Sequence, residues 1–350
     1  MVRQFAGSAA LTLLGLVLAA AYGWIDGHSV EAALGVVWIV VVLAVLEVSL
    51  SFDNAVVNAS VLQGMDAVWR RRFLTWGMLF AVFGTRVLFP LAIVGFTAGI
   101  GPVDALRLSL TDPVAYEATV SHAHYAIAGF GGAFLLLVGL EFFLDTGKDV
   151  HWIKGVETTL SRFADVEALG IGLALVLLVL VAAGLPGPAA LSFLTAGALG
   201  IVGHIAVQGL GRFFERREEQ RALAGLVVRS GLGGFLYLNV LDASFSLDGV
   251  IGAFALSNNM VVIAIGLSIG ALFVRSLTVM LVERGTLSEY RFLEHGAFWA
   301  IVALGVIMLV SARIDIPETV TGLIGAVLIA LSWAWSVRYR RRAGSEQEAG

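Results

Sequence analysis

The chain has 350 residues, of which 59% are hydrophobic and 14% are charged, and its formal net charge is −4. So few polar residues cannot cover a water-soluble protein of this size, and apolar stretches of about 18 residues or more, long enough to cross a bilayer, recur along the chain. The absence of cysteine excludes disulfides, thiolate metal ligands and thiol nucleophiles. The sequence therefore predicts an all-α polytopic membrane protein whose main surroundings are the lipid bilayer.

We predict ten membrane-spanning helices. They cover residues 8–25, 33–62, 73–99, 123–143, 167–185, 188–210, 231–256, 260–283, 296–311 and 318–337. The second is long and the ninth is short, which indicates tilt or an interruption. We expect the first to be an uncleaved helix, although Arg3 and the apolar run after it also fit a signal peptide.

Basic residues alternate between the predicted loops. Of the 22 Lys and Arg residues, 18 lie in one set of alternate loops, two lie in the other set and two lie inside spans. Because cytoplasmic loops carry the excess of Lys and Arg, we expect both termini in the cytoplasm and the protein in the inner (plasma) membrane. A missed or false span would disturb this alternation, so it supports the count of ten.

Two of the predicted spans carry the same polar pattern. Residues 46–62 read LEVSLSFDNAVVNASVL, and residues 241–257 read LDASFSLDGVIGAFALS. At a constant offset of 195 residues, the pattern aligns Glu47 with Asp242, Ser49 with Ser244, Ser51 with Ser246 and Asp53 with Asp248. Carboxylates are costly at membrane depth, so a repeated acidic pattern there indicates a functional site.

The repeat extends beyond the two motifs. The next span of each copy contains one arginine, Arg86 or Arg275, and residues 124–132 weakly match 298–306. The first motif lies in an inward-running span and the second in an outward-running one, so the two units are inverted. Inverted repeats that meet at a midplane site are typical of secondary transporters. We divide the chain into an N-terminal helix with an external loop (1–32), a first three-helix repeat (33–145), a central helix pair with cytoplasmic loops (146–230), a second, inverted repeat (231–315) and a C-terminal helix with a basic tail (316–350).

The motif side chains offer only oxygen as a ligand. On a helical wheel with about 100° per residue, one stripe holds Glu47, Ser51, Asn54 and Asn58, and the second copy repeats it with Asp242, Ser246 and Gly249. The other polar side chains of the motifs point elsewhere, so each helix is either enclosed by protein or unwound near its Asp, which Gly249 favours in the second copy. Oxygen ligands suit hard cations such as Mg²⁺, Ca²⁺ and Mn²⁺. Four carboxylates and two arginines would together leave a charge of −2, which one divalent cation balances.

A purely structural interpretation stays open for each group. An acid could pair with its arginine and fix helix packing, and the serine hydroxyls could bond a carbonyl one turn back. His204 is either a satisfied interior histidine or a proton carrier, and we expect Glu141 and Asp145 to be solvated. The spacing of Gly266 and Gly270 allows close helix packing.

These motifs resemble a known family. Residues 47–54 (EVSLSFDN) resemble the first signature of the TerC family of integral membrane proteins, and residues 242–250 (DASFSLDGV) resemble the second. The Gly-Val ending of the second motif, the stretch EHGAFWAI (294–301) and the additional spans resemble a related branch described only as a domain of unknown function. The resemblance covers residues 34–311. It implies an inverted-repeat exporter of the LysE-type superfamily, some of whose members are implicated in manganese efflux.

The resemblance also implies roles for particular residues. Asp53 and Asp248 would be the central metal ligands, and the flanking ligands would be Glu47, Asn54 and Asp242. Gly249 stands where the family usually has Ser, which removes one side-chain oxygen.

Two functions follow as hypotheses. The first is a divalent-cation exporter, with manganese as the substrate and proton exchange as a driving force. The alternative is a non-transporting subunit of a tellurite or envelope-stress resistance system with a structural cation site, in which homo-oligomers or complex partners are open. We expect no enzyme activity, because we see neither a nucleophile with its base nor an HExxH pattern, although paired aspartates could serve a membrane protease. We also expect no organic cofactor and no nucleic-acid partner.

Overall fold

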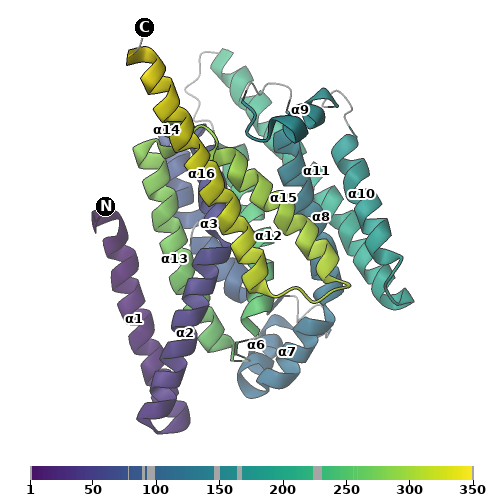
Figure 1. Ribbon diagram of the computed structural model, residues 1–350. Coiled ribbons are helices and arrows are strands. Elements are labelled where there is room, and N and C mark those ends of the chain that lie inside the picture. Colours follow the sequence, from purple (N-terminus) through teal and green to yellow (C-terminus); the bar gives the residue numbers. More distant parts are fainter. Residues whose placement is uncertain are drawn as a thin grey trace.

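The computed structural model describes residues 2–77, 79–88, 91–92, 99–145, 150–163, 168–223, 231–254, 256–257 and 259–348. These residues form helices and no strand (Figure 1). Seven helices are long and apolar enough to cross a membrane, namely α1, α2, α8, α11, α13, α15 and α16. Shorter apolar helices cover 169–182 and 232–245, within the fifth and seventh predicted spans. The predicted class, an all-α polytopic membrane protein, is confirmed.

The helices that cover the predicted spans overlap them, although α11 and α16 continue past the predicted ends at 210 and 337 to Leu223 and Glu348. In chain order, these helices are α1 (Val2–Gly27), α2 (Val30–Leu50), α3 (Phe52–Gln63), α8 (His124–Phe143), α10 (Leu169–Ala182), α11 (Gly187–Leu223), α12 (Leu232–Phe254), α13 (Met260–Arg284), α15 (Leu293–Ser311) and α16 (Glu318–Glu348). The shorter elements are α4 (Ala67–Arg72), the π-helices η1 (Phe73–Gly77) and η2 (Phe80–Leu88), α6 (Pro102–Thr111), α7 (Pro113–His122), α9 (Lys154–Arg162) and α14 (Thr286–Glu289). Part of the third predicted span lies outside the described residues.

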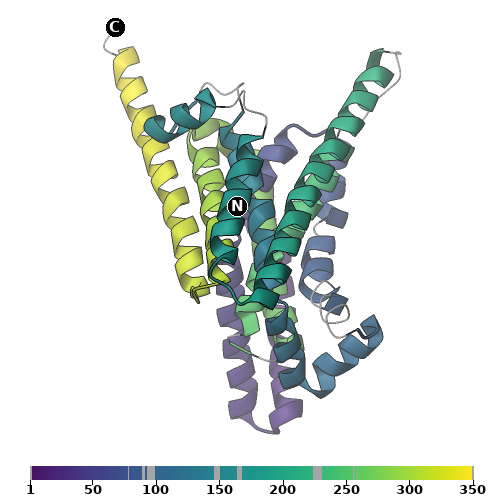
Figure 2. The same cartoon turned by 90° about the vertical axis from the view of Figure 1, so that its right-hand side faces the viewer.

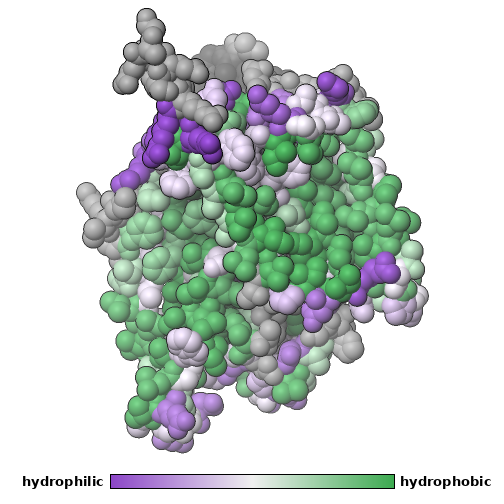
Figure 3. Space-filling model, viewed as in Figure 1, coloured by the Kyte–Doolittle hydropathy of each residue, from purple (hydrophilic) through white to green (hydrophobic). Residues whose placement is uncertain are grey.

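On the face shown in Figure 3, apolar residues cover the middle of the molecule, and polar residues gather above and below them. Large apolar side chains are exposed on several helices, among them Leu13, Trp38, Val176, Leu191 and Leu323. Water would make such a surface costly, whereas lipid tails would not. The surface therefore supports a multi-pass membrane protein.

The two ends of the bundle differ in the loops that they carry. α9, α14 and the C-terminal ends of α11 and α16 lie at the upper end in Figure 1, and α6, α7 and the α1–α2 turn lie at the lower end. Figure 2 shows α11 leaning outward toward its C-terminal end. The upper elements are the ones whose loops are predicted to be cytoplasmic, so the alternation of the chain agrees with the fold. Which membrane side each end faces stays a prediction.

Glycines bring the central helices into close contact. A Cβ on Gly132 of α8 would lie 3.0 Å from the carbonyl oxygen of Gly305 in α15, and a Cβ on Gly200 of α11 would lie 2.4 Å from the carbonyl oxygen of Phe130. α8 is therefore held between α11 and α15, and 83% of its span is buried. α8 and α15 run antiparallel, as the predicted inverted units require of their third helices, although the division into repeats stays a prediction.

The two motif helices differ in continuity. The first is interrupted at Ser51, where φ is −107° and ψ is 16°, so that α2 ends at Leu50 and α3 begins at Phe52. Of the tilt or interruption expected for the long second span, the structure shows an interruption. α12, in contrast, stays helical through Gly249. The prediction that the second motif helix unwinds near Gly249 is therefore wrong. A glycine costs a helix only about 1 kcal/mol, and contacts with η2, α8 and α11 support α12 on several sides.

Candidate functional site

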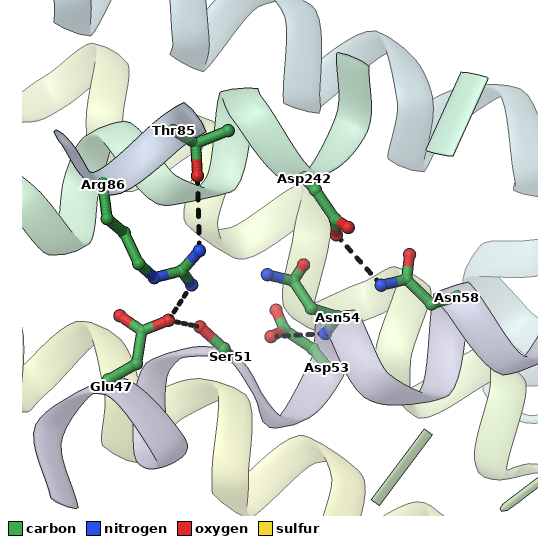
Figure 4. Close-up of polar contacts among 8 residues, drawn as sticks. All are labelled: Glu47, Ser51, Asp53, Asn54, Asn58, Thr85, Arg86 and Asp242. Atoms are coloured by element: carbon green, nitrogen blue, oxygen red, sulfur yellow. Dashed lines mark hydrogen bonds and ion pairs between the residues drawn. The ribbon is translucent and has the colours of Figure 1, made fainter. Parts of the chain in front are cut away.

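Glu47 lies where α2, η2, α12 and α13 meet. It is 2% exposed, and it forms an ion pair with Arg86 of η2, which is 6% exposed. The Ser51 hydroxyl donates to Glu47 Oε1 at 2.9 Å (Figure 4). A Cβ on Gly270 of α13 would lie 2.5 Å from Glu47 Cβ, and one on Gly249 of α12 would lie 3.2 Å from Glu47 Oε2. Gly270 thus packs closely against α2, as the glycine spacing allows, and Arg86 pairs with Glu47, which both the charge count and the structural interpretation expect.

Asp53 occupies the first turn of α3, immediately after the interruption. Its Oδ1 accepts the backbone N–H of Asn54 at 2.9 Å, and the residue is 5% exposed. The break gives α3 an N-terminus inside the membrane, whose positive dipole end favours a carboxylate. Asp53 lines a small pocket together with Ser49 and with Thr321 of α16, which α15 also borders. It therefore lies on a different face from Glu47, as the helical wheel predicts.

Asp242 lies on α12 opposite the middle of α3. Its Oδ1 accepts a hydrogen bond from Asn58 Nδ2 at 2.9 Å. Figure 4 shows Asn54, Asn58 and Asp242 directed into the same space between the two helices. These side chains are 6%, 1% and 7% exposed, and Asn54 Oδ1, Asn58 Oδ1 and Asp242 Oδ2 are buried with no hydrogen-bond partner among the described residues. Each orphaned acceptor costs about 1–3 kcal/mol, so this space is a candidate cation position.

The other predicted site residues have mainly structural contacts. The hydroxyls of Ser49 and Ser244 donate to the carbonyls of Val45 and Val240, each one turn back. For Ser49 and Ser244, these bonds match the purely structural interpretation, in which the hydroxyl bonds a carbonyl one turn back. The side chains of Ser246 and Asp248 lie outside the described residues, so their predicted roles stay predictions.

Arg275 does not repeat the contact of Arg86. Its Nε donates to the carbonyl oxygen of Leu74 in η1 at 2.9 Å, whereas Asp242, the counterpart of Glu47, bonds Asn58. The two copies therefore use their arginines differently. In the part of the chain that the structure describes, neither Asp53 nor Asp242 forms an ion pair with Lys or Arg.

The four motif carboxylates do not gather at one point within the described residues. No three His, Cys, Asp or Glu side chains there lie close enough to hold a metal ion together. Arg86 holds Glu47 on one face of the first motif helix, and Asp53 points toward α15 and α16 on another. The other oxygens at Asp242 instead come from the side-chain amides of Asn54 and Asn58. Amides are neutral, so a count of charges along the sequence does not include them.

Sequence reasoning also missed two features, one at this site and one at the upper end of the bundle. Arg86 lies on η2, and π-helices are rare beyond a single turn and are frequent at functional sites. At the upper end, Glu157 of α9 is 3% exposed and accepts the backbone N–H of Trp152 at 2.8 Å and the Trp299 indole N–H at 2.9 Å. The stretch EHGAFWAI thus anchors α9, and its Glu294 also accepts a hydrogen bond from Ser60 of α3. Neither the π-helices nor these long-range partners leave a pattern in the sequence.

The fold and its buried polar interior define a multi-pass helical membrane protein with an acidic site between helices. The chain belongs to the family described as "Protein of unknown function (DUF475)", whose profile matches residues 52–343. This agrees with the sequence resemblance to a branch described as a domain of unknown function, whereas the link to the TerC family stays a prediction. No curated protein and no solved structure matches the chain.

Proposed function

We propose that the protein is a transporter of divalent metal cations that exports manganese. The observation that carries the proposal is the set of three buried oxygens without hydrogen-bond partners on Asn54, Asn58 and Asp242. A cation that enters the space between α3 and α12 would be coordinated by these oxygens, which suit Mn²⁺ and Mg²⁺.

The charges around this space support a cation as the substrate. The ion pair with Arg86 neutralises Glu47, but Asp53 and Asp242 have no such pair in the described structure. A buried carboxylate without a counter-charge is costly by several kcal/mol, and a divalent cation in the space between α3 and α12 would offset that cost for Asp242. The choice of manganese, the direction of transport and the ligand roles of Asp53 and Asp248 come from the resemblance to the TerC family.

Cellular metal content tests the proposal. Cells that express the wild type, Asp242→Asn or Asp53→Asn are loaded with manganese, and total manganese is measured by elemental mass spectrometry. Asp104→Asn, a change of an exposed aspartate in α6, is the matched control. We expect the wild type and the control to lower cellular manganese and both site variants to fail. No decrease in any strain, with every protein present in the membrane, would refute manganese export.

The alternative is a non-transporting membrane subunit of a tellurite or envelope-stress resistance system with a structural cation site. The Glu47–Arg86 pair favours it, because that pair ties η2 to α2 without any cation. A purified protein that manganese stabilises against heat, but that moves no manganese across vesicle membranes, would support this alternative.

A further inference from the structure

A second polar cluster lies between α8 and α11, away from the acidic site. His204 of α11 is 5% exposed, and its Nε2 lies 3.0 Å from Gln208 Nε2 and 3.6 Å from Glu141 Oε2 of α8. One turn further, Arg212 Nη2 donates to Gln208 Oε1 at 3.0 Å. Phe134 presents an edge-to-face contact to the imidazole at 5.7 Å between ring centroids. The cluster therefore joins an enclosed imidazole to a carboxylate near the end of α8.

The hydrogen bonds fix the proton position of the neutral imidazole. Arg212 can only donate, so the Gln208 atom that it contacts is the amide oxygen. The amide nitrogen of Gln208 must then face His204, where it donates to the Nε2 lone pair. Neutral His204 consequently carries its proton on Nδ1, a buried atom with no hydrogen-bond partner among the described residues.

Protonation would change the partner of His204. A proton on Nε2 would face the N–H of Gln208, donor against donor, and Glu141 Oε2 is the acceptor within reach. The Glu141 side chain is 51% exposed against 7% for His204, so the carboxylate connects the imidazole to the surface. We infer that Glu141 and His204 form a proton-binding pair through which the protein exchanges protons for the transported cation, an inference that rests on the proposed function.

The surrounding helices connect this pair to the helix that carries Asp242. α12 packs against both α8 and α11, and its Tyr237 precedes Asp242 by five residues. α10, which packs against both α8 and α11, offers no titratable side chain between Leu169 and Ala182. The elements around the pair carry further charged or titratable groups. They are His124 and Tyr125 on α8, Asp145 after α8, Arg212, Glu215, Arg216, Arg217, Glu218, Glu219 and Arg221 on α11, Lys154, Glu157 and Arg162 on α9, Asp242 and Asp248 on α12, and Glu294 and His295 on α15.

Vesicles with a pH difference test the coupling. Purified full-length protein is reconstituted, the membrane potential is held at zero, and manganese is measured on both sides. With one proton exchanged per cation, a difference of one pH unit supports about a tenfold accumulation of manganese on the acidic side. We expect that ratio for the wild type and a ratio of about one for His204→Gln and Glu141→Gln. His124→Gln, at the opposite end of α8 where His124 contacts the Ser311 carbonyl, should behave as the wild type.

The outcomes separate this inference from the proposed function. Manganese movement by the wild type without a response to pH, or full accumulation by His204→Gln, would overturn the proton pair and leave transport standing. Absence of any manganese movement would refute transport itself. A second measurement then still decides the proton site: nitrogen NMR of histidine-labelled protein, with the His204 signal assigned by its loss in His204→Gln. A neutral His204 ring protonated on Nδ1 supports the proton-binding pair, and a neutral ring protonated on Nε2 overturns it.

Discussion

Replacement of Gly270 by alanine tests the close contact that positions Glu47. The added Cβ would lie 2.5 Å from Glu47 Cβ, 2.6 Å from Glu47 Cγ and 2.8 Å from the carbonyl oxygen of Ala44. Favourable contacts between carbon atoms are at about 3.5–4.0 Å, so α13 would have to move away from α2 by about 1 Å. The carboxylate cannot move aside freely, because Arg86 and Ser51 hold it from the other direction.

The size of the effect follows from this overlap. Over-packing of a close-packed interior costs about 1–3 kcal/mol, and the cost rises to about 3–5 kcal/mol when the shift separates Glu47 from Arg86. Alanine itself gains up to about 1 kcal/mol over glycine in a helix. Gly35→Ala is the matched control, because it lies on α2 and its new Cβ would meet nothing within 4 Å.

Thermal unfolding of the purified variants in detergent measures the difference. A penalty of about 1–3 kcal/mol corresponds, for a chain of this length, to a melting temperature roughly 1–4 °C lower for Gly270→Ala than for Gly35→Ala. Equal melting temperatures for the two variants would refute the reasoning, since α2 and α13 could then not be in contact at Glu47.

Three further predictions concern the polar contacts. Arg86→Gln should destabilise the protein by about 3–5 kcal/mol, because it leaves Glu47 buried and unpaired; the added change Glu47→Gln should restore most of the loss in thermal unfolding, and no restoration would contradict the pairing. Asn58→Ala removes the donor to Asp242 and one orphaned oxygen, so stabilisation of the purified protein by Mn²⁺ should fall; an unchanged manganese-induced shift in melting temperature would exclude Asn58 from the site. Trp299→Phe removes the indole hydrogen bond to Glu157, so the free energy of local opening of α9 should fall by about 1 kcal/mol, and trypsin should cleave within α9 roughly fivefold faster. An unchanged cleavage rate would contradict the docking of α9 through the indole.

The positions of the spanning helices could be read from the sequence. α8 and α13 begin and end within one residue of the predicted 123–143 and 260–283. Long apolar runs bounded by charged loops have few alternative placements in a membrane. The second predicted span covers 30 residues, more than a straight crossing of the bilayer needs, so its length predicted either tilt or an interruption without deciding between them.

The partners of the site residues could not be read from the sequence in the same way. The wheel correctly separates Asp53 from Glu47, since that separation depends only on the local spacing along α2 and α3. The bond from Asn58 to Asp242 joins residues 184 positions apart, and its existence depends on how two helices are packed. Equal motifs likewise suggested equal contacts, yet Arg275 bonds a carbonyl where Arg86 bonds a carboxylate. The local spacing of polar residues is encoded in each repeat, whereas their pairing is decided by the neighbours that surround each copy.

The burial of α8 has a consequence for how the protein is made. α11 and α15, which cover α8 through Gly129, Gly132 and Gly139, are synthesised after it. Helices that enter a bilayer first and associate afterwards must each be stable in lipid alone. α8 must therefore be stable in two surroundings in succession. Its apolar residues stabilise it among lipid tails before α11 and α15 are made, and its glycines then allow these two helices to pack closely against it. A polar substitution on α8 could thus block biogenesis even where the finished protein would tolerate it.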